Sequence, residues 1–303
     1  MNNKFSVVIS AYNASDFIGK TLDSVRAQTY KDYEVVVVDD GSPIPMGPAI
    51  EAYQKQYPDF PLRYVWQENE GPAGARKKCA MEGQYEWLAF LDHDDLWYPN
   101  KLEVMNQAIN EHPADIYYHD EDEVEEDGSG KKRISYRQLD AADPVEDLVI
   151  NGNTLSTSAT VIKRQFFLDA DPYSAKARVG EDYECWIKLG VAGGTFYHVD
   201  QVLGQYVRMS TSLTMKSVDY MKASNERIVD FYDYLNPAKL SAEEIAALKD
   251  ERRAFNEYLV GRFYHANKDY KTAREYYKKS LGMDKGNKKC HVANILAMLH
   301  VRV

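Results

Sequence analysis

The chain has 303 residues and 44% hydrophobic content, which is enough for one large α/β domain and a smaller appendage around a buried core. Lys and Arg number 37 against 47 Asp and Glu, a formal net charge of −10, and this acidity argues against nucleic acid as a partner. Cys79, Cys185 and Cys290 are far apart and form no C-x-x-C pair. This spacing argues against a disulfide framework or a thiolate zinc site and fits a reducing cytoplasm.

The longest apolar runs, residues 5–11 and 35–38, are far shorter than the roughly 20 residues that a membrane-spanning helix needs. The N-terminus also lacks the charged-then-apolar order of a signal peptide. We therefore expect a cytoplasmic protein that is soluble or peripherally attached to the inner face of the membrane.

The first hundred residues alternate strand-like and helix-like segments, which predicts βαβ units and a mainly parallel sheet flanked by helices. The helix after the first strand has Ile18, Leu22 and Val25 on its inner face, with Ser15 as its expected N-cap. A further helix is expected at 73–83. Strands are predicted at 5–11, 33–38, 62–67 and 87–91.

Two acidic loops follow two of these strands. Asp39-Asp40-Gly41-Ser42 ends the second strand and Asp92-His93-Asp94-Asp95 ends the fourth. Open α/β sheets bind ligands at the carboxyl edge of their parallel strands, so both loops are expected to border one cleft.

The remainder of the chain is less regular. A strand at 116–119 runs into the acidic segment 120–127, for which a solvated hairpin is favoured slightly over a role near the acceptor. From residue 217 the chain reads as helical, with a break at Asn236-Pro237. Residues 261–287 resemble one tetratricopeptide unit of about 34 residues, although a packed helical pair is the simpler interpretation. Seven tyrosines in this part are suited to interfaces and suggest a homo-oligomer: Tyr232, Tyr234, Tyr258, Tyr264, Tyr270, Tyr276 and Tyr277.

The carboxylates suggest a chemistry. A nucleoside diphosphate leaving group gains negative charge, and a divalent cation held by carboxylates neutralises it; oxygen ligands suit Mg²⁺ or Mn²⁺. Asp92, Asp94 and Asp95 supply such ligands, although an acidic loop alone is more often a solvated turn. Tyr12 can lie against a base, and Asp40 can accept a hydrogen bond from an imide N–H.

Four motifs, at 7–13, 38–42, 69–76 and 90–95, resemble family 2 glycosyltransferases of the GT-A fold in order and in spacing. The resemblance covers roughly residues 4–215, so we expect a glycosyltransferase domain at 1–215 and a helical extension at 216–303.

The resemblance implies specific roles for individual residues. Ala11, Tyr12 and Asn13 would line the nucleotide site. Asp40 would contact uracil, with Arg76 nearby and Arg208 near the diphosphate. Asp94 would bind the ribose and share the Mn²⁺ or Mg²⁺ with Asp95, and Asp92 would support the site.

Asp182, in Gly180-Glu181-Asp182, would be the general base of an inverting displacement. Without the resemblance, Glu181 and Asp182 read as ordinary first-turn carboxylates of a helix.

We thus expect transfer of a single hexose or N-acetylhexosamine from a UDP-sugar to a saccharide, lipid-linked saccharide or glycoprotein, as in bacterial surface glycan synthesis. No histidine follows Arg208 to complete a metal shell, and no Gln-x-x-Arg-Trp sequence of processive members is present. The alternative is a catalytically decayed scaffold that binds nucleotide sugars and acts through its helical tail. A nucleotidyltransferase or a dinucleotide dehydrogenase is disfavoured because no glycine-rich loop follows the first strand.

Overall fold

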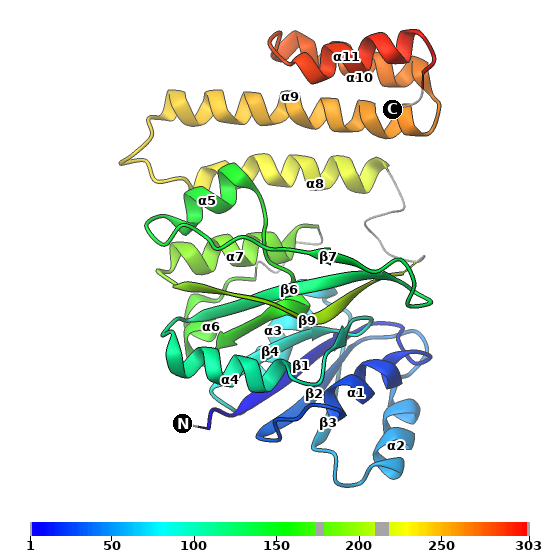
Figure 1. Cartoon of the computed structure of the whole chain (residues 1–303), viewed down its shortest axis with the longest axis vertical. Coiled ribbons are helices and arrows are strands. Elements are labelled where there is room, and N and C mark those ends of the chain that lie inside the picture. Colours follow the sequence, from blue (N-terminus) through cyan, green and yellow to red (C-terminus); the bar gives the residue numbers. More distant parts are fainter. Residues whose placement is uncertain (1, 174–178, 210–217, 302–303) are drawn as a thin grey trace. The chain divides into compact units, whose positions relative to one another are not determined.

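The computed structural model describes residues 2–173, 179–209 and 218–301, which separate into two compact units, Met1–Ser210 and Thr211–Val303 (Figure 1). The first unit is a sheet flanked by helices and the second is helical.

Four parallel strands begin the first unit. Their register sets Ala11 opposite Asp39 and Ser10 opposite Asp92, so both acidic loops leave the same edge of the sheet, as predicted. The elements of this part are β1 (Phe5–Ala11), α1 (Ile18–Arg26), β2 (Tyr33–Asp40), α2 (Gly47–Gln56), β3 (Leu62–Gln67), α3 (Gly71–Glu82) and β4 (Trp87–Asp92).

The second half of this unit makes the sheet mixed. Within the described residues the strand order is β3-β2-β1-β4-β8-β6-β9-β5, with β7 paired to β6. β8 runs antiparallel to both β4 and β6, whereas β6 and β9 are parallel. These elements are β5 (Leu96–Trp97), α4 (Lys101–Glu111), β6 (Ile116–Glu125), β7 (Lys132–Ile134), α5 (Pro144–Asn151), η1 (Thr157–Ala159), β8 (Thr160–Lys163), α6 (Arg164–Ala170), α7 (Glu181–Val191) and β9 (Phe196–Arg208).

Successive side chains of the central strands point to opposite faces of the sheet and pack against a layer of helices on each face. Val7 and Val35 point into one cluster with Leu22 of α1 and Leu102 of α4. The opposite face packs on α3 and α6, where the rings of Phe90 and Phe167 are 5.3 Å apart. The fully buried strands explain the near-continuous apolar runs of the sequence.

Two local predictions are wrong. α1 begins at Ile18 with Phe17 at its N-cap position and no side-chain cap, so Ser15 does not cap the helix. The acidic segment does form a hairpin, since β6 pairs antiparallel with β7, but its first part is not solvated: the side chains of Asp120, Glu121 and Asp122 are at most 5% exposed.

Each buried carboxylate of β6 is compensated by a partner. Arg133 and His198 reach Asp120 at 2.6 and 2.8 Å. The Tyr136 hydroxyl donates to Glu121. Asp122 accepts from the hydroxyl of Tyr98 and pairs with Lys131.

The second unit contains α8 (Val218–Asp230), η3 (Phe231–Tyr234), α9 (Ala242–Ala266), α10 (Tyr270–Met283) and α11 (Lys288–Met298). The predicted break is confirmed, since Asn236 and Pro237 lie between η3 and α9. The tetratricopeptide likeness stays a prediction. No described helix is both long and apolar enough to cross a membrane.

The tyrosines of this unit serve its own core more than its surface. Tyr258 and Tyr277 pack with Ala273, Cys290 and Ala293. Tyr277 is 0% exposed, and its hydroxyl bonds His265 at 3.0 Å. Tyr232 is buried as well, so these three of the seven tyrosines are unavailable to a partner.

Close packing at Gly261 gives a test of this core. A Cβ on Gly261 would lie 2.6 Å from two ring carbons of Tyr277, so Gly261→Ala should lower the free energy of unfolding by about 1–3 kcal/mol. Gly282→Ala is the matched control, because no described heavy atom lies within 4 Å of its Cβ and alanine favours helix by roughly 0.5–1 kcal/mol. Thermal unfolding followed by circular dichroism measures both, and an equal effect of the two changes would contradict the packing.

Candidate functional site

The first two loops at the sheet edge are joined to each other. The Asn13 amide donates to the Ser42 hydroxyl at 2.8 Å, and Ser42 in turn donates to Asp39. Asn13 has a φ of 54°, a left-handed conformation that asparagine tolerates. Ala11 is buried, whereas Tyr12 is 48% exposed and its ring is open to a ligand.

Asp40 holds the start of α3. Its carboxylate accepts from Gln67 at 2.7 Å and from the backbone amides of Glu70 and Gly71 at 2.9 Å. An ionised carboxylate at a helix N-terminus is stabilised by the exposed amides and the helix dipole. Three of about four lone-pair sites are therefore filled, and roughly one remains for an incoming N–H.

The loop Asp92–Asp95 concentrates desolvated negative charge. Burial raises the pKa of Asp94. Burial, reinforced by repulsion from Asp94 and Glu121, holds the pKa of Asp95 well above its usual range. The carboxylate oxygens of Asp95 accept from the Val207 amide at 2.9 Å and from the Ser158 hydroxyl.

Ser158 holds this loop through hydrogen bonds, although no sequence motif marks it. Its hydroxyl accepts from the Asp92 amide at 3.0 Å while donating to Asp95. Its carbonyl accepts from the Trp97 indole at 2.9 Å and from Lys101 at 2.6 Å. These partners are 57 to 66 residues away in the chain, so no local pattern marks Ser158.

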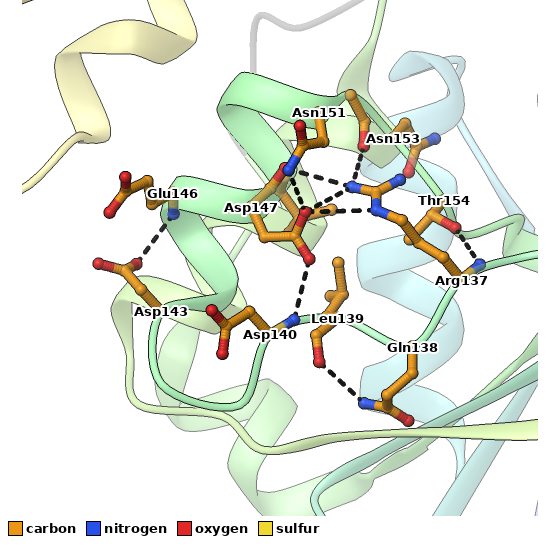
Figure 2. A network of polar contacts seen from close by, with 12 residues as sticks. Arg137, Gln138, Leu139, Asp140, Asp143, Glu146, Asp147, Asn151, Asn153 and Thr154 are labelled. Atoms are coloured by element: carbon orange, nitrogen blue, oxygen red, sulfur yellow. Dashed lines mark hydrogen bonds and ion pairs between the residues drawn. The ribbon is translucent and has the colours of Figure 1, made fainter.

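A polar network around Arg137 and Asp147 orders residues 137–154, the segment that precedes Ser158 (Figure 2). Arg137 donates to Asp147 at 3.0 Å and to the Gly152 carbonyl at 2.8 Å, which satisfies the C-terminal end of α5. The Tyr183 hydroxyl then donates to the Leu148 carbonyl of α5. The first turn of α7 thus rests on α5.

Arg76 links the acidic loop to α7. It lies in the middle of α3, its side chain is 10% exposed, and its guanidinium pairs with Asp92 at 2.9 Å and with Glu181 at 2.7 Å. The sequence suggested a nucleotide contact for Arg76. In the structure its terminal nitrogens bridge two carboxylates from segments 89 residues apart.

Asp182 follows Glu181 in the first turn of α7, which Gly180 enters with a φ of 67°. Burial and the neighbouring Glu181 raise the pKa of Asp182 to about 6, against the opposing effect of Arg76. A carboxylate with this pKa is ionised at neutral pH and is still basic enough to accept a proton.

Arg208 ends β9, one residue after the Val207 amide that bonds Asp95. Its guanidinium lies 3.6 Å from Glu123 and 3.7 Å from Glu125. Residues 210–217, which follow this strand, lie outside the described residues.

The protein side chains of the site could supply only part of the ligand shell of a divalent cation. Among the residues that the structure describes, no group of three or more His, Cys, Asp or Glu is arranged to hold a metal ion. Asp94 and Asp95 nevertheless form an acidic pair, since Arg76 and Lys101 are bonded to other groups. Mg²⁺ is commonly held by one or two carboxylates plus substrate phosphates and water, and this donor set fits that mode.

Known proteins share this architecture. The structure of Staphylococcus aureus TarS residues 1–349 in complex with UDP-GlcNAc matches at a TM-score of 0.62 with 18% identity, covering 99% of this chain and 89% of that one. The mannosyltransferase PcManGT of Pyrobaculum calidifontis, in complex with GDP-Man and Mn²⁺, matches at 0.61 with 14% identity over 99% and 85%. The expected α/β transferase fold is thereby confirmed.

Relatives by sequence include an uncharacterized glycosyltransferase of Rickettsia conorii, 27% identical over 61% of this chain and 31% of its own length. The "Putative teichuronic acid biosynthesis glycosyltransferase TuaG" of Bacillus subtilis is 26% identical over 69% of this chain and 81% of its own. The chain spans about a third of the length of the Rickettsia relative. The model of the family "Glycosyl transferase family 2" matches residues 6–158, half of the chain, and the chain therefore belongs to this family.

Proposed function

We propose that this protein is an inverting glycosyltransferase that moves one hexose or N-acetylhexosamine from a UDP-sugar to an acceptor hydroxyl. The observation that carries the proposal is the Arg76 bridge, because it joins the donor-side Asp92 to the helix turn that bears Asp182. Family membership supports the transferase class.

The donor side is assigned from the loops at the sheet edge. Tyr12 would lie against the uracil, and Asp40 would use its remaining acceptor site on the imide N–H. Ala11 and Asn13 would shape the backbone around the base, and Arg208 would approach the diphosphate. TarS has been crystallised with UDP-GlcNAc and with UDP, and PcManGT with GDP-Man, which supports a nucleotide-sugar donor. Uridine is proposed from the motif resemblance.

Asp94 and Asp95 would hold Mn²⁺ or Mg²⁺ together with the donor phosphates, and Asp94 would also reach the ribose. When bound, the cation neutralises the negative charge of the departing diphosphate. Ser158 keeps the loop in place by bonding Asp92 and Asp95 at once.

Asp182 would act on the acceptor side. Its carboxylate removes the proton of the acceptor hydroxyl while that oxygen bonds to the anomeric carbon and the bond to the UDP oxygen breaks. The products are an inverted glycoside, UDP and a protonated Asp182, which then loses its proton to solvent. Desolvation by the surrounding helices keeps the carboxylate reactive.

Cell-surface glycan synthesis is the proposed setting, on the strength of TuaG, whose printed name refers to teichuronic acid biosynthesis. The acceptor would be a saccharide, a lipid-linked saccharide or a glycoprotein, reached from the cytoplasmic side. We also propose the division into a transferase domain at 1–215 and a helical extension at 216–303.

Donor binding is tested by thermal shift. At a hundredfold excess over its dissociation constant, UDP with Mn²⁺ should raise the melting temperature by roughly 5–10 °C, and UDP without metal should raise it far less. Asp95→Asn should abolish the metal-dependent part. Asp182→Asn, the matched control, should keep it and lose transfer; no shift with UDP in the unmodified protein would favour the decayed scaffold instead.

The ionisation of Asp182 predicts a pH profile. Because the base must be deprotonated, kcat/KM should rise about tenfold per pH unit below about 6 and level off above it. Glu181→Gln removes a carboxylate that raises the pKa of Asp182, so the rising limb should move to lower pH. A profile that Glu181→Gln leaves in place would count against Asp182 as the titrating group.

The bridge itself can be broken. Arg76→Gln leaves Asp92 and Glu181 without their shared cation in a largely desolvated position and should cost about 3–5 kcal/mol of unfolding free energy. Lys77→Gln on the same helix is the control, since Lys77 and Asp171 are both about half exposed and such a pair contributes at most about 1 kcal/mol. Urea unfolding measures the free energy of unfolding of each variant. Similar decreases in the two variants would show that the Arg76 ion pairs contribute no more than an exposed pair.

A further inference from the structure

The last described helix, α11, is apolar on two opposite sides. Its inner side packs Cys290, Ala293 and Ala297 against the core of the second unit. A helix with apolar residues all round is normally buried, whereas a surface helix shows one apolar stripe. The outer side of α11 is therefore expected to be covered.

The outer side carries a continuous apolar row. Val292, Ile295 and Leu299 are 56%, 52% and 61% exposed. Their spacing of three and four residues places them in one line along the helix.

Positive charge lies at the N-terminal end of this row. Lys288 and Lys289 begin α11, Lys285 lies in the turn before it, and all three are exposed. Residues 262–303 contain ten Lys and Arg but three Asp and Glu, and no acidic residue occurs at 285–303. The rest of the chain is acidic, with 27 Lys and Arg against 44 Asp and Glu.

We propose that α11 docks the protein on an anionic lipid bilayer. We define the α11 surface as Val292, Ile295 and Leu299 together with Lys285, Lys288 and Lys289. The apolar row would enter the boundary between head groups and acyl chains, and the lysines would contact anionic head groups.

Other occupants fit this surface less well. A second copy packed through the same surface would bring its lysines toward each other, with no acidic residue on α11 to offset them. A soluble polyanion would use the lysines but would leave the apolar row uncovered. A bilayer with negative head groups uses both the lysines and the apolar row.

Vesicle sedimentation of the full chain tests the proposal without any donor sugar, so its outcome is independent of the transferase reaction. Binding is expected with phosphatidylcholine vesicles that contain phosphatidylglycerol, weakening as salt is added, and not with phosphatidylcholine alone. Charge reversal by Lys285→Glu, Lys288→Glu and Lys289→Glu should lower the partition constant by on the order of a hundredfold.

Two further variants make the test specific. Lys20→Glu, Lys55→Glu and Lys163→Glu change the net charge equally at exposed lysines of the first unit and should leave binding near that of the unmodified protein. Val292→Ser, Ile295→Ser and Leu299→Ser should abolish vesicle binding with an unchanged circular dichroism spectrum, since these side chains are more than half exposed.

Several results would overturn the proposal. Equal binding to neutral and anionic vesicles, or equal loss in the first-unit charge variant, would remove the role of the α11 lysines. Retained binding in the serine variant would indicate a surface for a polyanion. Self-association in sedimentation velocity that the serine variant loses, without vesicle binding, would assign the surface to a second copy.

Discussion

The site is organised around a desolvated ion triad in which Arg76 carries Asp92 and Glu181. A buried arginine is tolerated only when its partners are well placed, so the triad constrains the elements that supply them. α3 is fixed twice, at its start by Asp40 of β2 and in its middle by β4 and α7. This helix sets the relation between the nucleotide-facing strands and the turn that bears Asp182.

With Arg76 committed in this way, several nearby carboxylates lack a full counter-charge. Burial is the largest cause that raises the pKa of Asp94, Asp95 and Asp182, and nearby carboxylates raise it further. A raised pKa means that ionisation is less favourable in the folded chain than in the unfolded one. The contribution of these three groups to the free energy of unfolding is therefore fully present at low pH and is lost as the pH rises through the folded pKa. Binding of a cation or a proton relieves this cost of burying negative charge. The proposed chemistry uses both, a cation at Asp94 and Asp95 and a proton at Asp182.

The strands and both acidic loops were predictable because continuous apolar runs mark buried parallel strands and because such strands end at a common edge. Partners supplied from distant segments were not predictable. Asp120 looked solvated because the side chains that bond it, Arg133 and His198, lie 13 and 78 residues away along the chain. Ser158 carried no local signal. The family resemblance implies a place near the nucleotide for Arg76, but its bond to Glu181, 105 residues away, could not be predicted from the sequence.

The second unit shows the same limit in a different form. Its tyrosines suggested an interface, yet Tyr277 is fully buried while Val292 and Leu299 face outward, because helical phase and not residue type decides which side is covered. The net charge of −10 is the sum of an acidic first part, residues 1–261, and a basic end, residues 262–303. Salt screens exposed charges beyond about 8 Å at physiological ionic strength, so a surface that contacts α11 responds first to the lysines within that distance. The net charge of a chain therefore argues against anionic partners only where the charge is evenly distributed. In this chain the charge is unevenly distributed, so the basic end can still contact an anionic surface.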